Sequence, residues 1–127
     1  ATMFLGTEII NQFTNDELIT KKGPVFQTAI IAGIQGVKKT SDIIPMCHPL
    51  LINGVNIDIS VVDDLHIEVT CKVTIEGKTG VEMEALTGAS ATCLTIYDMC
   101  KAISQVMIIK EVKLIQKTGG KSDIKKQ

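Results

Sequence analysis

The sequence contains no arginine and no tryptophan, and its only aromatic residues are one tyrosine and three phenylalanines. All thirteen basic residues are therefore lysines, so any phosphate site must use ammonium and backbone N–H groups without the guanidinium fork. A formal net charge of −1 gives no general attraction to nucleic acid or to an anionic membrane, and we expect neither as a partner. With 45% hydrophobic residues, residues 1–127 are expected to form one domain with an aliphatic core.

Four cysteines are enough for two disulfides, but their pattern favours free thiols. Cys93 and Cys100 lie seven residues apart on one expected helix, about 10 Å by helical rise, which is too far for a disulfide. Cys71 alternates with apolar residues in an expected strand. The sequence has no secretory signal and no apolar run long enough to span a membrane. We therefore expect reduced thiols in a cytoplasmic protein.

A proline-free stretch from residue 77 to residue 101 predicts the longest helix. One face repeats apolar residues at spacings of three and four: Leu86, Ala89, Cys93, Ile96, Cys100 and Ile103. A second stripe has small residues in its middle and charges at its ends: Glu84, Gly88, Ala91, Thr95, Asp98 and Lys101. Small side chains let a second backbone, a subunit or a ligand approach closely. We expect this helix to pack the core on one side and to present chemistry on the other.

Alternating apolar and polar residues predict a hairpin with strands at 55–61 and 65–75. An amphipathic helix is expected at 25–39, after the break at Gly23 and Pro24. The other expected segments are a strand at 2–5, a helix at 7–13, polar or irregular chain at 19–22 and 40–49, and a last strand at 106–117. This order predicts an α+β protein, a ferredoxin-like βαββαβ sandwich with an extra N-terminal helix and an antiparallel sheet. Residues 118–127 are expected to be a flexible tail.

A glycine-rich turn before the long helix suggests an anion site. Gly77, Lys78 and Thr79 end like a phosphate-binding P-loop, but the glycine that opens that motif would fall at Lys72. Such a turn can still bind an anion through its free N–H groups, or it is only a connection between strand and helix.

Cys47 and His48 are the residues that a metal site would use, but no second pair at metal-ligand spacing accompanies them. We therefore expect no metal. Pro45 and Pro49 flank His48 and hold it in a fixed place on a loop, where it is either a binding residue or a structural one. His66, on the polar face of the hairpin, is expected to be a surface residue.

Charged residues on the long helix also have two interpretations. Glu82 and Glu84 lie at its expected N-terminus, where carboxylates stabilise the helix through its dipole. Asp98 and Lys101, three residues apart, form either a surface ion pair of little energetic weight or an acid–base couple in a pocket. The small-residue stripe leading to them favours the couple. Loop lysines, which are solvated unless folding gathers them around a phosphate chain, are Lys21, Lys22, Lys117 and Lys121.

Several segments, in the same order along the chain, resemble the MoaC family, the cyclic pyranopterin monophosphate synthases of molybdenum cofactor biosynthesis. The most specific are Cys-His-Pro-Leu at 47–50, Gly-Lys-Thr-Gly-Val-Glu-Met-Glu-Ala-Leu-Thr at 77–87 and Thr-Ile-Tyr-Asp-Met-Cys-Lys at 95–101. Lys-Gly-Pro-Val-Phe at 22–26, Ala-Gly-Ile-Gln at 32–35 and Lys-Thr-Gly-Gly-Lys-Ser at 117–122 also match. Together the segments span nearly the whole chain.

The resemblance implies a ferredoxin-like fold and a homo-hexamer, a trimer of dimers, with active sites at the dimer interface. It implies a lyase that converts 3′,8-cyclo-7,8-dihydroguanosine 5′-triphosphate to cyclic pyranopterin monophosphate and releases pyrophosphate. The purine-derived ring is opened and rebuilt as a pterin, and a cyclic phosphate closes as pyrophosphate leaves. No cofactor is implied, and Mg²⁺ would enter only as a counter-ion of pyrophosphate.

The resemblance also implies roles for residues of this sequence. Asp98, Lys101 and Lys22 are implied as catalytic, with Asp98 and Lys101 acting as base and acid at the ring. The implied substrate-binding set is Cys47, His48, Glu82, Met83, Glu84, Lys117 and Lys121. Within it the lysines hold the triphosphate together with Lys22, His48 joins them across the interface, and the two glutamates orient the guanine edge or the catalytic lysine.

Two features depart from the family pattern, and a competing class stays open. The family's N-terminal segment with an arginine is absent from this sequence, and Pro24 stands where the family has aspartate, which removes a carboxylate and a backbone donor near Lys22. Ferredoxin-like domains also serve as ligand-binding or scaffold modules. The positions of five candidates separate the two classes: convergence in one cleft favours the enzyme, and scattered positions favour the binding module. These candidates are Lys22, His48, Asp98, Lys101 and Lys117.

Overall fold

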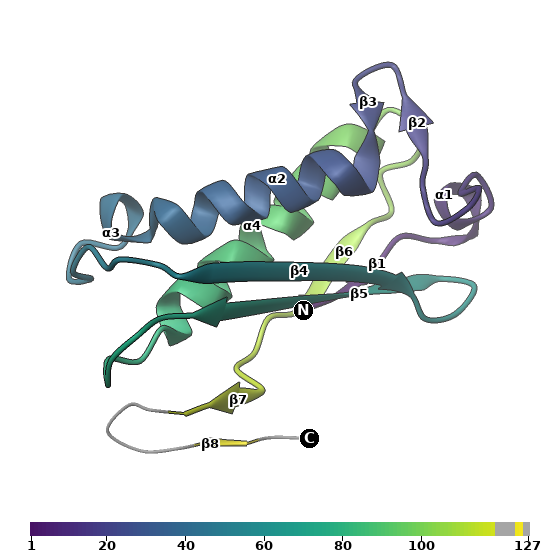
Figure 1. Ribbon diagram of the computed structural model, residues 1–127. Coiled ribbons are helices and arrows are strands. Elements are labelled where there is room, and N and C mark those ends of the chain that lie inside the picture. Colours follow the sequence, from purple (N-terminus) through teal and green to yellow (C-terminus); the bar gives the residue numbers. More distant parts are fainter. Residues whose placement is uncertain (119–123, 126–127) are drawn as a thin grey trace.

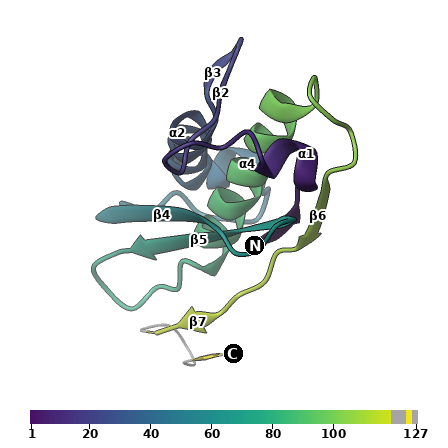
Figure 2. The same ribbon diagram turned by 90° about the vertical axis from the view of Figure 1, so that its right-hand side faces the viewer.

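The computed structural model describes residues 1–118 and 124–125, which form a mixed α/β fold around a four-stranded antiparallel sheet (Figure 1). The strands are β1 (Thr2–Phe4), β4 (Gly54–Val61), β5 (His66–Thr74) and β6 (Ile108–Glu111), in the spatial order β4-β5-β1-β6. Two long helices, α2 (Val25–Lys38) and α4 (Glu82–Cys100), pack against each other on one face of the sheet (Figure 2). The expected combination of helices with an antiparallel sheet is confirmed at this level.

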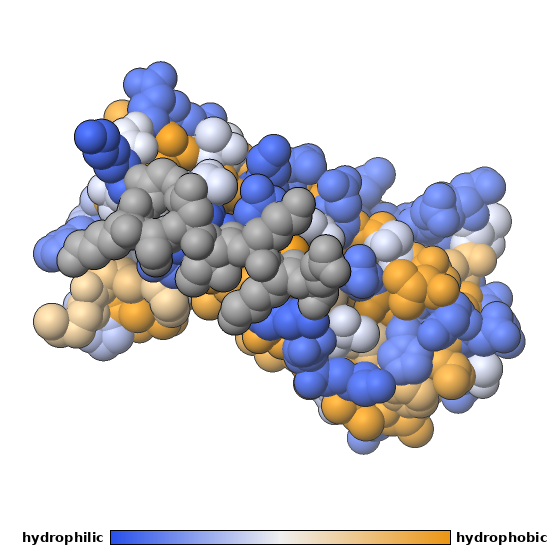
Figure 3. Space-filling view, turned by 90° about the horizontal axis from the view of Figure 1, so that it is seen from below, coloured by the Kyte–Doolittle hydropathy of each residue, from blue (hydrophilic) through white to orange (hydrophobic). Residues whose placement is uncertain are grey.

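The β4–β5 hairpin follows the alternation in the sequence. Its register runs from Gly54 opposite Thr74 to Val61 opposite Ile67. Ile57, Ile67 and Val69 are buried on the side of the helices, and the polar residues between them face the other way. From below the sheet, hydrophilic and hydrophobic residues are interspersed on the surface (Figure 3). The predicted hairpin is therefore confirmed, with one face in the core.

The two long helices approach closely because small residues meet where they touch. A Cβ atom on Gly36 would lie 3.0 Å from the Ala91 Cβ, and a Cβ on Gly88 would lie 3.2 Å from the Gly33 carbonyl oxygen. The small-residue stripe predicted on α4 is thus covered by the backbone of α2 over Gly88 and Ala91. The predicted apolar face of α4 is buried as expected, at Ala89, Cys93, Ile96 and Cys100.

The core is aliphatic and contains thiols. Its largest fully buried side chains include Met3, Leu5, Ile9, Ile67 and Ile96, and all four cysteines are free, as the spacing of Cys93 and Cys100 predicts. Within residues 1–118 and 124–125, no helix is long and apolar enough to cross a membrane.

Two expectations in the N-terminal quarter are wrong in part. The first helix, α1 (Thr7–Ile10), ends three residues early because the amides of Gln12 and Phe13 turn back to carbonyls only three residues away. The segment at 19–22, expected to be a loop, contains β2 (Ile19–Thr20), which pairs with β3 (Gly23–Pro24) in a small hairpin. Gly23 makes this hairpin feasible because its φ is +113°, a value that favours glycine.

Two later expectations also need correction. A short helix, α3 (Thr40–Ile43), begins the segment expected to be irregular, and its turn is closed by the Ile44 N–H, which donates to the Thr40 carbonyl at 2.8 Å. The expected strand at 106–117 is broken after β6. Its partner β1 has only three residues, and the register shifts between Thr2 and Met3. Among the described residues, the chain beyond Glu111 therefore has no neighbouring strand until β7 (Gln116–Lys117) pairs with β8 (Ile124–Lys125). The flexible tail expected at 118–127 stays a prediction, because its residues 119–123 and 126–127 lie outside the described chain.

Candidate active site

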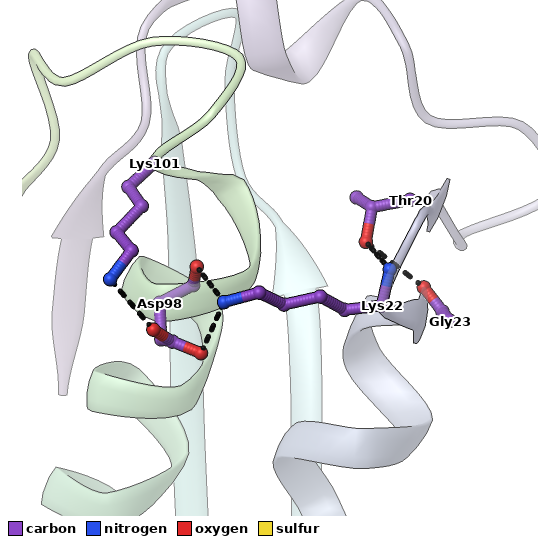
Figure 4. A network of polar contacts seen from close by, with 5 residues as sticks. All are labelled: Thr20, Lys22, Gly23, Asp98 and Lys101. Atoms are coloured by element: carbon purple, nitrogen blue, oxygen red, sulfur yellow. Dashed lines mark hydrogen bonds and ion pairs between the residues drawn. The ribbon is translucent and has the colours of Figure 1, made fainter.

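Asp98, in the last turn of α4, binds two lysines at once (Figure 4). Its Oδ2 lies 2.9 Å from the Lys22 Nζ and its Oδ1 lies 2.9 Å from the Lys101 Nζ. The Lys22 Nζ also donates to the Asp98 main-chain carbonyl at 3.4 Å. All three side chains are about half exposed, so a solvent-borne ligand has access to both ammonium groups and to the carboxylate.

The two lysines set the charge state of this cluster. Hydrogen bonds from Lys101 and then from Lys22 lower the pKa of the Asp98 carboxyl below its usual value, because both favour the ionised form. Asp98 is therefore a carboxylate at neutral pH, as a base must be. Since the groups are exposed, the ion pairs add little to stability.

Lys22 comes to this cluster from the tip of the β2–β3 hairpin, which precedes α2 in the sequence. The Thr20 hydroxyl oxygen accepts a hydrogen bond from the Lys22 main-chain N–H at 3.1 Å, and the Thr20 hydroxyl donates weakly to the Gly23 carbonyl at 3.4 Å (Figure 4). These bonds hold the backbone of the turn, and this fixed backbone directs the long Lys22 side chain toward Asp98. No sequence pattern predicts this pair, because its members are 76 residues apart.

A second group of candidates lies at the other end of α4. Glu84 is buried, with 5% of its surface exposed, and lines a cavity of about 50 Å³ together with the exposed His48. Val37 and Lys38 of α2 and Leu50 of the following loop complete much of its wall. The structure therefore brings together the two sequence-predicted residues His48 and Glu84, and the neighbouring Cys47 is half-buried.

Glu82 begins α4 and faces a different hollow. Its Oε1 lies 3.6 Å from the Lys117 Nζ, and its Oε2 is buried without a hydrogen-bond partner among the described residues. Gly80 leaves room for the pair, because a Cβ atom there would collide with Glu82 Oε2 and lie 3.1 Å from Lys117 Cε. The pair lines a groove of about 710 Å³ between α4, residues 68–73 of β5 and residues 111–118.

The candidates thus fall at two ends of one helix and do not share a cleft in a single chain. Glu82 and Asp98 belong to the same helix and are separated by about 24 Å along its axis, at about 1.5 Å per residue. Met83 is half-buried near the first end, and Lys121 lies outside the described residues. Within the described part of the chain, no three His, Cys, Asp or Glu side chains are grouped so as to hold a metal ion.

Sequence reasoning missed one residue that shapes the site. The carboxylate of Glu17 accepts hydrogen bonds from the N–H groups of Phe26 at 2.7 Å and of Gln27 at 3.0 Å, in the first turn of α2. No residue at the helix boundary itself supplies a side-chain cap. A helix cap is usually a local residue, so only the unusual Pro24 at the boundary signals that the cap comes from elsewhere.

Fold and cluster together define a mixed α/β protein with a lysine–aspartate–lysine site open to solvent at one end of its longest helix. The profile of the MoaC family matches residues 1–120, and the chain belongs to the MoaC family.

Three relatives illustrate this membership. A "Cyclic pyranopterin monophosphate synthase" of Helicobacter hepaticus is 61% identical over 103 residues, covering 80% of this chain and 65% of the relative. A "Molybdenum cofactor biosynthesis bifunctional protein" of Synechocystis is 57% identical over 120 residues, 91% of this chain and 35% of the relative. "Molybdenum cofactor biosynthesis protein 1" of Dictyostelium discoideum is 58% identical over 108 residues, 85% of this chain and 17% of the relative. The chain therefore spans less than two thirds of the length of each.

Proposed function

We propose that this chain is a cyclic pyranopterin monophosphate synthase, which converts 3′,8-cyclo-7,8-dihydroguanosine 5′-triphosphate to cyclic pyranopterin monophosphate and pyrophosphate. The observation that carries the proposal is the Asp98 carboxylate held between Lys22 and Lys101 at 2.9 Å each. Membership in the MoaC family and the name of the Helicobacter hepaticus relative support the same reaction.

Asp98 and Lys101 act in this proposal as base and acid at the ring. Opening a purine-derived ring and closing a pterin require protons to leave and arrive at ring atoms, and a carboxylate beside two ammonium groups offers both directions of transfer. Lys22 lies within reach of the same carboxylate. It holds Asp98 ionised and supplies positive charge for the phosphate chain.

The remaining candidates bind and orient the substrate. Lys117, Lys121 and His48 neutralise the triphosphate, whose leaving pyrophosphate gathers negative charge as the cyclic phosphate closes. Glu82 and Glu84 orient the guanine edge or a catalytic lysine, and Met83 and Cys47 complete the substrate-binding set. No metal or other cofactor is required, and Mg²⁺ acts only as a counter-ion of pyrophosphate.

One substrate meets both ends of α4 only if two chains contribute to one site. The axial separation of about 24 Å within a helix supports a site between two protomers, in which one provides Asp98, Lys101 and Lys22 and the other provides His48 and the glutamates. We propose a homodimer that assembles further into a hexamer, a trimer of dimers.

The finer features of the fold belong to the same proposal. The sheet order β4-β5-β1-β6, with α2 and α4 as its two crossover helices, supports a ferredoxin-like βαββαβ sandwich in which α1 is the extra N-terminal helix. Residues 1–127 would form one domain, working in the cytoplasm without nucleic-acid or membrane partners.

Single-turnover reaction with the cyclic dihydro-GTP compound tests the function. Pyrophosphate and the fluorescent oxidised pterin should appear together and in equal amounts, and Asp98→Asn should make neither at a comparable rate. A folded wild-type protein that binds the compound but releases no pyrophosphate would overturn the proposal.

That negative outcome would favour the second candidate, a ligand-binding module. The observation in its favour is the separation of His48 and Asp98 at opposite ends of the chain's longest helix. Equilibrium binding of the compound, measured alongside turnover, separates the two: the module binds and releases it unchanged.

A further inference from the structure

We propose that Glu17 is a positioning residue of the substrate site, whose carboxylate fixes the base of the β2–β3 hairpin and so holds Lys22 against Asp98. The proposal rests on the proposed function only in taking Lys22 as a residue of that site.

The Glu17 carboxylate ties the two sides of the hairpin together. Oε1 accepts from the N–H of Leu18 at 2.9 Å, just before β2, and from the N–H of Phe26 at 2.7 Å, just after β3; Oε2 accepts from Gln27 at 3.0 Å. The Val25 N–H donates to the Leu18 carbonyl at 2.9 Å between them. One side chain therefore closes the hairpin base and caps α2, whose positive dipole end favours the charge.

Glu17 itself is held in place by a tight turn. Its main-chain N–H and carbonyl exchange hydrogen bonds with Thr14 at 3.1 and 2.8 Å. The two residues between them, Asn15 and Asp16, have φ values of +54° and +62°, as in the primed turns that close tight hairpins. The carboxylate is thus fixed from both sides, by its own backbone and by the amides it binds.

The β2–β3 hairpin depends on the hydrogen bonds of the Glu17 carboxylate because α2 has no local side-chain cap. Pro24 occupies the helix boundary and gives α2 no side-chain cap. Beyond Thr20, whose hydroxyl oxygen accepts from the Lys22 N–H, the hairpin has only two residue pairs. If the base opens, Lys22 moves with the tip, and its Nζ loses the 2.9 Å contact with Asp98.

The test reads the Lys22–Asp98 contact without relying on activity. The pKa of the Asp98 carboxyl is titrated by ¹³C NMR in the wild type, Glu17→Gln, Lys22→Ala and the control Glu8→Gln, which removes an exposed carboxylate from the first turn of α1. We expect Glu17→Gln to raise the pKa of Asp98 toward its value in Lys22→Ala, and Glu8→Gln to leave it in place.

The direction of the shift separates positioning from a simple charge effect. Removing a negative charge near Asp98 would by itself lower the pKa of its carboxyl, whereas losing Lys22 raises it. An unchanged or lowered value in folded Glu17→Gln overturns the proposal. Should that variant fail to fold, Glu17→Asp replaces it: the charge stays, the side chain is one methylene too short to span Leu18 and Phe26, and the same upward shift is expected.

Kinetics add a second readout that a merely stabilising residue would not give. We expect Glu17→Gln to lower kcat/KM about tenfold in the wild type and less than about twofold in Lys22→Ala, because a residue that acts through Lys22 has nothing left to position. Losses that multiply would mean that Glu17 acts independently of Lys22. If the wild type shows no turnover, the failure is that of the proposed function, and the titration still decides the role of Glu17.

Discussion

Gly33 of α2 and Gly88 of α4 meet backbone against backbone: a Cβ atom on Gly33 would lie 3.0 Å from the Gly88 carbonyl oxygen. The same atom would collide with the Thr92 Oγ1 and with the Ile57 Cδ1. Thr92 is fully buried, and its hydroxyl donates to the Gly88 carbonyl at 2.8 Å, so it has no free direction in which to move. This contact sets how close α2 and α4 come, and with it the position of Lys22 relative to Asp98.

Gly33→Ala should therefore destabilise the protein although alanine favours helix. Overpacking of a filled core costs about 1–3 kcal/mol, and two collisions place this site at or above the upper end, which exceeds the gain in helix propensity of about 1 kcal/mol. We expect a net loss of about 2 kcal/mol in the free energy of unfolding, measured by urea denaturation. Gly54→Ala is the control, because among the described residues its Cβ would meet only Thr74, at 3.9 Å. Equal losses of stability at both positions would contradict the overpacking expected at Gly33.

Asp63 should make stability depend on pH in acid. Hydrogen bonds from the Leu65 N–H and then from the His66 side chain lower the pKa of the Asp63 carboxyl below 3.8. Because the folded pKa is the depressed one, the stabilisation is fully present above about pH 4 and is lost as the pH falls through the folded value. Asp63→Asn should flatten the pH dependence of the unfolding free energy below pH 4.

Asp64→Asn provides the matched control in the same turn. Asp64 is exposed, and its substitution should keep the acid dependence of the wild type.

The predicted surface character of His66 is wrong in part, because only 19% of its side chain is exposed and its Nδ1 lies 3.0 Å from Asp63.

Thiol reactivity should separate the cysteines by their pKa values. Burial raises the pKa of Cys71 and of Cys100 to about 11 and also raises that of Cys93, and the thiolate is the reactive form. At pH 8, iodoacetamide should label Cys71, Cys93 and Cys100 slowly, and the rate at Cys71 should rise about tenfold per pH unit up to pH 10. Peptide mass spectrometry resolves the four sites, and rapid labelling of Cys71 at pH 8 would refute the assignment.

Asp98→Asn should reduce turnover far more than it affects folding. The substitution keeps the shape but removes the charge between Lys22 and Lys101, so kcat should fall by about 10²- to 10⁴-fold, the usual contribution of a general base. Thermal unfolding should change little because the ion pairs are exposed. Asp58→Asn, on the polar face of β4, makes the same charge change, and a similar loss of activity there would contradict the role of Asp98.

Local patterns predicted the elements that have their own periodicity. The alternation through Ile57, Val69 and Cys71 predicted the β4–β5 hairpin, and the apolar spacing through Cys93 and Ile96 predicted α4. The break after Glu111 could not be predicted, because it depends on β1 being only three residues long where β6 needs a partner.

In the candidate site too, local contacts could be predicted from the sequence and tertiary contacts could not. Asp98 and Lys101 could be paired from their spacing on one helix, and the Lys101 Nζ is found 2.9 Å from the Asp98 carboxylate. The contact of Lys22 with that carboxylate and the cap supplied by Glu17 are tertiary contacts without a sequence signal. The separation of His48 from Asp98 follows from the length of α4, which the sequence did predict to be long.

The proposed synthase site is built by two chains, and subunit complementation tests this arrangement. Asp98→Asn and His48→Ala proteins carrying different tags are co-expressed, and mixed oligomers are isolated through both tags before turnover of the cyclic dihydro-GTP compound is measured. Each parent should be inactive. A two-fold dimer of one chain of each kind has one intact site and one with both defects, so each mixed dimer should recover about half of the wild-type turnover. In a hexamer assembled at random only about half of the dimers are mixed, so the isolated oligomers should recover about a quarter. Mixed oligomers as inactive as their parents would contradict a site shared between chains.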